Sequence, residues 1–447
     1  MEEKTSTFLI IASTVAALGG LLFGFDTAVI SGTTPFIQPF FHLSDVGLGW
    51  TVSSLLIGCI IGVTLSGRPG DLFGRRNTLR AAALVFFVSA VGSSLAARLW
   101  VFIVFRFFGG IAVGTASMLS PMYISEISPG ARRGALVSLN QLAIVIGILI
   151  AFFSNYLLVG VGPDNWRWML AVMGLPALFF FISLLFVPES PRWLVQKGKT
   201  EEAFGILSRI NGSEKASTEL RDIESSVHNE ERGTYREVFS KELRPLLMIG
   251  VLLAIFQQMT GINSIMYYAP IIFQKIGSGT SSALMQTIAV GAVNLTFTIV
   301  SLKLIDRWGR KPLLIVGAIG MVVSLAVIAI AFFTHHFEGY LILVFILIFI
   351  ASFAVSIGPV AWVVIAEIFP NKLRSKAMSV AIVTLWTFTF LVSLTFPVIL
   401  DRLGGGAAFA IFGVMCLLLL FYVIFRLPET KGKSLEELER ILVSKRG

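Results

Sequence analysis

Twelve apolar runs, each close to the length of a membrane span, most limit how this chain can fold. They cover residues 8–31, 48–67, 78–97, 100–121, 135–159, 168–187, 245–270, 281–301, 312–333, 340–366, 377–400 and 406–427. A helix needs about 20 apolar residues to cross the hydrocarbon core, whereas a barrel strand needs about ten that alternate. Backbone groups in hydrocarbon must be paired, and a helix pairs its own. The runs therefore predict an all-α membrane protein with twelve transmembrane helices.

The composition excludes several classes of function. Of the 447 residues, 55% are hydrophobic and 14% are charged, compared with about 25% charged in ordinary soluble proteins. Cys59 and Cys416 both lie inside apolar runs, so we expect no disulfide framework, no metal site and no cofactor. Gly198-Lys-Thr and Gly432-Lys-Ser lack the first glycine of a phosphate-binding loop, so we expect no nucleotide site. No cluster of catalytic side chains is evident, and we do not expect an enzyme.

The placement of Lys and Arg predicts the orientation. Four basic residues lie in the loops on one side of the predicted spans: Arg98, Arg167, Lys275 and Arg402. Thirteen lie in the short loops on the other side: Arg68, Arg75, Arg76, Arg80, Arg132, Arg133, Lys303, Arg307, Arg310, Lys311, Lys372, Arg374 and Lys376. Because basic loops stay in the cytoplasm, we expect a multi-pass cell-membrane protein with both termini cytoplasmic. The net charge of +9 is then a signal of topology and not of nucleic-acid binding.

Three motifs recur in the same order. Asp71 and Asp306 each open an Asp-x-x-Gly-Arg-basic pattern, Glu126 and Glu367 each precede an arginine by seven residues, and Pro188-Glu-Ser returns as Pro428-Glu-Thr. Their offsets are nearly constant, which indicates two pseudo-symmetric halves. We predict a six-helix half at 1–187, a cytoplasmic linker with amphipathic helices at 188–244, a second six-helix half at 245–427 and a cytoplasmic tail at 428–447. An even number of spans makes the halves parallel, with the substrate between them.

The repeated charged motifs predict a cytoplasmic latch. Glycines let helix ends approach closely, and the carboxylates and arginines can pair across the cytoplasmic junction and separate again as the halves rock. Charges that only set the topology are the alternative. The residues assigned to this latch are Asp71, Gly74, Arg75, Arg76, Glu126, Asp306, Gly309, Arg310, Lys311, Glu367 and Arg374.

These motifs also carry a family resemblance. Together with Arg106-Phe-Phe-Gly-Gly110, Pro121-Met-Tyr-Ile-Ser-Glu126 and Pro188-Glu-Ser-Pro-Arg192, they resemble the sugar porter family of the major facilitator superfamily. The stretch Gly19–Gly32 is most similar to bacterial proton-coupled D-xylose symporters. The resemblance covers essentially the whole chain and implies the major facilitator fold.

Asp26 is the first candidate for proton coupling. It lies about midway along the first span, where an ionised carboxylate costs a few kcal/mol. Burial raises a carboxyl pKa and a nearby cation lowers it, so a carboxyl that gains and loses a cationic partner can bind and release a proton. The resemblance implies that the partner is Arg133. The alternative is a permanent ion pair that holds two helices together.

Amide side chains in the spans are candidates for sugar recognition, because each donates to one hydroxyl and accepts from another. Gln257, Gln258 and Asn263 flank Gly261, which permits a helix break that turns them toward one cavity, and Tyr267 is a candidate extracellular lid. The resemblance implies that Gln141, Asn294 and Phe23 line the same pocket. Hydrogen bonds that only connect helices are the alternative role.

Two tryptophans complete the predicted pocket. Gly358-Pro359 predicts a hinge in the tenth span with Trp362 beside it, and Trp386 lies in the eleventh span. An indole suits the C–H face of a sugar ring. Ile148 and Leu385 depart from the pattern of the xylose carriers, which have an amide at these positions. Xylose, glucose and other monosaccharides therefore all remain open.

The sequence thus predicts a secondary active transporter, in which a monosaccharide enters with a proton by alternating access. We expect it to act as a monomer in the lipid bilayer, without nucleic acid. A passive facilitator that uses the same pocket is the first alternative. A receptor that binds sugar without moving it is the second, and a continuous channel is disfavoured by the paired charges and the helix interruptions.

Overall fold

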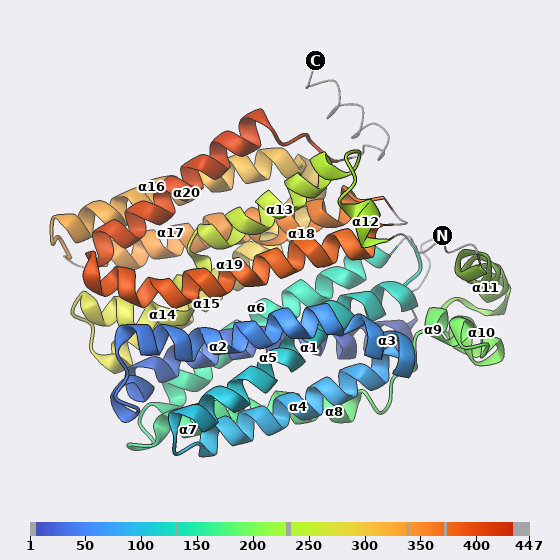
Figure 1. Cartoon of the computed structure of the whole chain (residues 1–447), viewed down its shortest axis with the longest axis horizontal. Helices are drawn as coiled ribbons and strands as arrows, with labels where there is room; N and C mark the ends of the chain where they lie inside the picture. Colours follow the sequence, from blue (N-terminus) through green and yellow to red (C-terminus); the bar gives the residue numbers. More distant parts are fainter. Residues whose placement is uncertain (1–5, 131, 229–233, 338–339, 371–372, 432–447) are drawn as a thin grey trace. The chain divides into compact units, whose positions relative to one another are not determined.

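The computed structural model describes residues 6–130, 132–228, 234–337, 340–370 and 373–431, and twenty helices are assigned in these ranges (Figure 1). The first ten are α1 Thr7–Phe40, α2 Asp45–Leu65, α3 Gly67–Phe73, α4 Arg75–Leu95, α5 Leu99–Ile127, α6 Arg133–Leu158, α7 Asn165–Val172, α8 Gly174–Ser183, α9 Pro191–Gln196 and α10 Thr200–Asn211. The others are α11 Ser213–His228, α12 Tyr235–Val238, α13 Arg244–Met259, α14 Ile262–Lys275, α15 Thr280–Trp308, α16 Arg310–Phe333, α17 Leu341–Val355, α18 Ile357–Glu367, α19 Arg374–Arg402 and α20 Gly404–Phe425.

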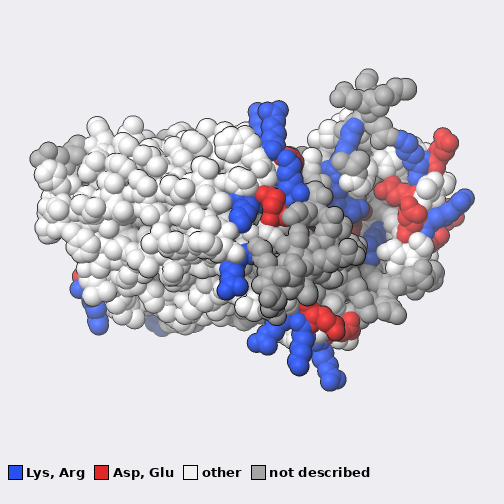
Figure 2. Space-filling model, turned by 90° about the horizontal axis from the view of Figure 1, so that it is seen from above, with Lys and Arg blue, Asp and Glu red and all other residues white. Residues whose placement is uncertain are grey.

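The expectation of twelve membrane-length helical segments is confirmed. In the described part of the chain, twelve segments are long and apolar enough to cross a bilayer. Nine are single helices, and three are pairs in which a short interruption separates two helices: α7 with α8, α13 with α14, and α17 with α18. On the face drawn in Figure 2, charged side chains gather toward one end and a broad surface carries almost none. Such a surface suits contact with lipid.

Contacts group the chain into two compact units, each of which we describe by itself. The first comprises the described residues of 1–26, 57–151 and 167–231. In it α4 packs along α5 and α8, while α9, α10 and α11 pack on one another (Figure 1). The second comprises the described residues of 27–56, 152–166 and 232–447. In it α16 packs along α17 and α20, and α13 packs along α19. The predicted division at residues 187 and 245 rests on the sequence repeat and stays a prediction.

The linker contains the short amphipathic helices that its sequence predicts. Leu194 of α9 and Ala203, Leu207 and Ile210 of α10 are buried, and their neighbours in sequence are more exposed. Ser190 caps α9 by accepting a hydrogen bond from the Trp193 N–H, as expected of a serine at this position. The predicted C-terminal tail falls largely on 432–447, outside the described residues.

Two interruptions determine the geometry of the second unit. Gly261 has φ +86° and separates α13 from α14, which confirms the predicted break. A left-handed backbone of this kind favours glycine because it has no Cβ. The other interruption lies at Ser356, with φ −123° and ψ −105°. The hinge therefore lies before the predicted Gly358-Pro359, which is already inside α18.

Candidate functional site

A buried ion pair lies near the middle of α1. Arg106 Nη1 of α5 lies 2.5 Å from Asp26 Oδ1, and the two side chains are 1% and 3% exposed. Both residues belong to the first unit. An uncompensated charge at this depth is costly, whereas a paired and hydrogen-bonded one can be tolerated. The carboxylate that the sequence singled out is therefore paired with one arginine, Arg106, in this structure.

The predicted partner of Asp26 was wrong for this structure. Arg133 is exposed at the first turn of α6, whereas the part of α6 that meets α1 near Asp26 is the stretch around Ile144 and Gly147. Ile144 follows Arg133 by eleven positions in the helix, or about 16 Å along the axis at 1.5 Å per residue, which is beyond the reach of the Arg133 side chain. Arg106, eighth in α5, could have been found from the sequence, because an arginine so far inside an apolar span needs a partner.

The amides around the Gly261 break form a continuous hydrogen-bonded row. Asn263 Nδ2 donates to Gln258 Oε1 at 2.5 Å, and Gln258 Nε2 donates to Gln257 Oε1 at 3.4 Å. Gln257 Nε2 then donates to the carbonyl of Gly358 at 2.9 Å and to that of Ile357 at 3.2 Å. The break thus brings together residues that a straight helix would hold about 140° apart. We call Gln257, Gln258 and Asn263 the amide row.

The other predicted sugar-binding residues lie on several helices. In the second unit, Tyr267, Asn294 and Trp386 are buried on α14, α15 and α19, and Trp362 of α18 is half-buried. Phe23 of α1 and Gln141 of α6 are half-buried in the first unit. Of the predicted residues, the structure connects the amide row and Gly358 directly. A sugar-binding role for all of them stays a prediction.

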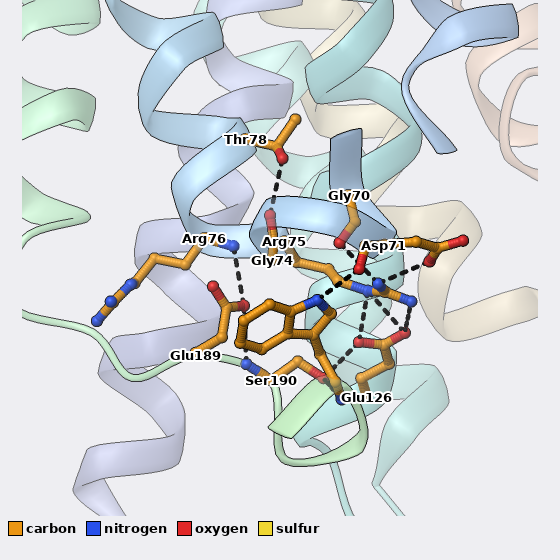
Figure 3. Close-up of polar contacts among 10 residues, drawn as sticks. Gly70, Asp71, Gly74, Arg75, Arg76, Thr78, Glu126, Glu189 and Ser190 are labelled. Atoms are coloured by element: carbon orange, nitrogen blue, oxygen red, sulfur yellow. Dashed lines mark hydrogen bonds and ion pairs between the residues drawn. The ribbon is translucent and has the colours of Figure 1, made fainter. Parts of the chain in front are cut away.

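A charged cluster lies at the start of α4 (Figure 3). Arg75 Nη2 lies 3.1 Å from Glu126 Oε1, and Arg75 Nη1 lies 2.9 Å from Asp71 Oδ1. The Ser190 hydroxyl donates to Glu126, and Glu189 Oε1 accepts from the backbone N–H of Arg76 at 3.0 Å. Negative charge is favourable at a helix N-terminus, so Glu189 stabilises the beginning of α4. We call this group the first cluster.

The second unit repeats this arrangement at the start of α16. Arg310 Nη2 lies 2.6 Å from Glu367 Oε1, and Arg310 Nη1 lies 3.4 Å from Asp306 Oδ1. The Thr430 hydroxyl donates to Glu367 at 2.8 Å, and Glu429 Oε1 accepts from the backbone N–H of Arg310 at 3.0 Å. We call this group the second cluster. Its ion pairs and its hydroxyl contact match those of the first cluster, and the Lys311 N–H, from which Glu429 Oε2 accepts, corresponds to the Arg76 N–H.

Backbone hydrogen bonds lower the pKa of Glu429. Partial burial of the carboxyl favours its neutral form, but the N–H groups of Lys431, Arg310, Lys311 and Thr430 outweigh this effect and hold the pKa below its ordinary value. Glu429 Oε2 accepts from the Lys311 N–H at 2.9 Å, and Oε1 accepts from the Lys431 N–H at 2.9 Å. The carboxylate is thus a helix cap that stays charged at neutral pH.

The latch role of these residues stays a prediction. The carboxylates that Arg75 and Arg310 contact lie in the same unit as the arginine that binds them. The Nε of Arg374 donates to the Phe369 carbonyl at 3.3 Å. Glu189 and Glu429 were missed, although the doubled Pro-Glu-Ser/Thr motif already marked both positions.

No group of three or more His, Cys, Asp or Glu within the described ranges is placed to share a metal ion. What these ranges do contain is a set of twelve membrane-length helices, a charged pair buried among them and two matching charged clusters. This architecture defines a class of protein, the twelve-helix membrane proteins of the major facilitator fold.

The comparisons with known proteins agree with this class. The family model described as "Sugar (and other) transporter" matches residues 12–442. The chain belongs to this family, whose members are transporters and not enzymes.

Relatives are similar over nearly the whole chain. The arabinose-proton symporter of Bacillus subtilis is 42% identical over 98% of this chain and 95% of its own. The D-xylose-proton symporter of Escherichia coli is 42% identical over 98% of this chain and 96% of its own. A structure of the xylose transporter XylE from E. coli in a partially occluded inward-open conformation has a TM-score of 0.86 at 41% identity and covers 96% of this chain and 100% of its own.

Proposed function

We propose that this protein carries a monosaccharide of the pentose class into the cell together with a proton. The observation that carries the proposal is the buried Asp26–Arg106 pair. A passive carrier needs no ionisable carboxyl at this depth, and keeping one there is costly. The names of the arabinose-proton and D-xylose-proton symporters support both the coupling ion and the class of sugar.

Coupling in this proposal depends on competition between Arg106 and a proton for the carboxylate of Asp26. While Arg106 lies 2.5 Å from Asp26, the ion pair favours the charged carboxylate. A shift of α5 relative to α1 would remove the cation, and the isolated carboxylate would then take up a proton. Return of Arg106 would expel it. One proton would cross per cycle, and its electrochemical gradient would drive the sugar inward.

Sugar recognition is assigned to the amide row. Gln257, Gln258 and Asn263 present amide oxygens and N–H groups beside a helix break, which suits the alternating donors and acceptors of a sugar. Phe23, Gln141, Tyr267, Asn294, Gly358, Trp362 and Trp386 complete the proposed set. Because Ile148 and Leu385 cannot donate or accept through their side chains, we expect a different order of sugar preference from carriers with amides there.

Alternation is assigned to the two charged clusters at the starts of α4 and α16. We propose that both lie on the cytoplasmic side, as do the chain termini, in agreement with the excess of Lys and Arg in these loops. Each arginine binds carboxylates on separate helices, so each cluster holds its helices as one body. The protein is proposed to work as a monomer.

Transport by purified protein in proteoliposomes tests the proposal. An imposed inward proton gradient should drive labelled D-xylose or L-arabinose above equilibrium. Asp26→Asn should abolish this accumulation and leave exchange of labelled for unlabelled sugar intact, because the variant keeps the shape of the side chain without titrating. Exchange without accumulation by the wild type would identify a passive facilitator. Binding without exchange would identify a receptor.

A further inference from the structure

The junction between α17 and α18 lacks a backbone hydrogen bond that a continuous helix would make. Pro359 has no N–H, so it cannot donate to the carbonyl of Val355, four residues earlier. Val355 is the last residue of α17, and Ser356 departs from helical geometry with ψ −105°. The Val355 carbonyl therefore needs a donor from elsewhere, because the surrounding hydrocarbon offers none.

Ser301 of α15 supplies that donor. Its Oγ donates to the Val355 carbonyl at 2.9 Å, and the residue is fully buried. Ser301 is not part of the amide row or of either charged cluster, and no motif in the sequence singles it out. Its hydroxyl takes the place of the N–H that Pro359 lacks.

The opposite side of the same junction is held by the amide row. Gln257 Nε2 donates to the carbonyls of Ile357 and Gly358, which are the first two residues of α18. The beginning of α18 is thus fixed between a serine on α15 and a glutamine on α13. Trp362, a proposed sugar contact, follows Gly358 by four residues on α18. The direction in which α18 leaves the junction therefore determines where this indole lies.

Two other prolines show the same compensation. Pro35 in α1 cannot donate to the Ser31 carbonyl, which instead accepts from the Thr34 hydroxyl at 2.8 Å. Pro397 in α19 cannot donate to the Ser393 carbonyl, which accepts from the Tyr268 hydroxyl at 2.9 Å. A hydroxyl directed at the carbonyl that a proline leaves unpaired is therefore a recurring device in this chain.

We infer that Ser301 is a positioning residue for the α17–α18 hinge, through which α15 sets the direction of α18 relative to the amide row. This role deepens the proposed function, because the hinge carries a proposed sugar contact. Loss of the hydroxyl leaves the Val355 carbonyl unpaired and loosens the junction without removing any group proposed to touch the sugar.

Amide hydrogen exchange of a peptide spanning residues 353–362, in the purified full-length protein, tests the inference without reference to any sugar. Ser301→Ala should speed exchange at the junction about tenfold, which corresponds to about 1.4 kcal/mol. Ser301→Thr keeps a hydroxyl and should stay within about twofold of the wild type, since the donor remains. Ser324→Ala is the matched control: this buried serine donates to carbonyls of its own helix and should leave the junction unchanged.

A proline variant makes the test specific. In a Pro359→Ala background the alanine N–H can serve the Val355 carbonyl, so Ser301→Ala should there speed exchange less than about threefold. An equal effect of Ser301→Ala in both backgrounds, or none in the wild-type background, would overturn the inference.

A transport measurement distinguishes a failure of the hinge inference from a failure of the proposed function. Ser301→Ala should lower the maximal rate of sugar exchange in proteoliposomes about fivefold and change the Kd for sugar less than about twofold, because the amide row is intact. A rise in Kd with an unchanged rate would overturn the positioning role. A wild type that moves no sugar would refute the proposed function, while the hydrogen-exchange result would still decide the hinge.

Discussion

At the scale of single residues, the buried Asp26–Arg106 pair lowers the stability of the protein unless its geometry is good, so its presence indicates a function. Desolvating two charges costs several kcal/mol, and their attraction repays this only with good geometry. The 2.5 Å contact provides that geometry, but Arg106 Nε is buried without a hydrogen-bond partner. The pair is therefore not fully satisfied, which suits a contact that opens in the proposed transport cycle.

Replacing Arg106 and Arg133 one at a time tests which arginine is the ion-pair partner of Asp26. Arg106→Gln leaves the Asp26 carboxyl buried without its cation and should lower the free energy of unfolding by about 3 kcal/mol. Arg133→Gln, at an exposed position, should change it by less than about 0.5 kcal/mol. Thermal unfolding of both variants in the same detergent compares them. Equal losses of stability would contradict the assignment of Arg106 as the partner.

The lowered pKa of Glu429 predicts a dependence of stability on pH. Its ordinary value is 4.5 and the folded protein holds it lower, so the unfolded chain binds the proton more tightly. The stabilisation is therefore complete above about pH 4.5 and is lost as the pH falls through the folded pKa. Glu429→Gln should unfold at a lower temperature than the wild type at pH 7, and the difference should shrink as the pH drops below 4.5. A constant difference would show that the charge is not what stabilises α16.

At the scale of helices, α4 and α16 begin in the same way. Gly74 has φ +98° and Gly309 has φ +92°, and a Cβ at either position would overlap the carboxylate of Glu189 or Glu429. Each of these glycines is thus required for two reasons: the left-handed backbone, and the close approach of the capping carboxylate. The doubled Gly-Arg-basic motif therefore encodes a helix start as well as a charge cluster.

Substitution of this glycine should be costly. Gly74→Ala should lower the free energy of unfolding by about 2 kcal/mol, because it adds backbone strain and displaces Glu189 from the start of α4. Gly67→Ala is the matched control, since nothing lies within 4 Å of a Cβ there. Chemical unfolding followed by circular dichroism measures both. Similar stabilities for the two variants would refute the role of Gly74.

The sequence was sufficient to predict the membrane-spanning helices and some of the breaks within them. Length and hydropathy alone locate all twelve spans, because hydrocarbon leaves few alternatives for the backbone. The Gly261 break was predictable from a glycine between amides that a straight helix would separate. The hinge at Ser356 was not, because its position also depends on Ser301, which lies 55 residues earlier in the chain. The sequence marks Arg106 as a residue that needs a partner, but its pairing with Asp26 depends on how α1 and α5 align, and one sequence does not state that alignment.

At the scale of the whole molecule, orientation in the membrane is the prediction to check. Cys59 and Cys416 are both buried, so a single introduced cysteine can report on its side of the membrane. Thr218 on α11 and Val161 between α6 and α7 are both exposed. A membrane-impermeant maleimide should label Val161→Cys in intact cells and Thr218→Cys only after permeabilisation. The reverse pattern would invert the proposed topology.

Two glycines bring α1 and α6 close together in the first unit. Side chains at Gly24 and Gly147 would overlap the carbonyls of Ile144 and Leu21, so backbone meets backbone at these two positions. We expect the distance between the two helices to be fixed here by the absence of side chains. A single methyl group added at either glycine would act as a wedge, which makes this seam as sensitive to mutation as the charged residue that it flanks.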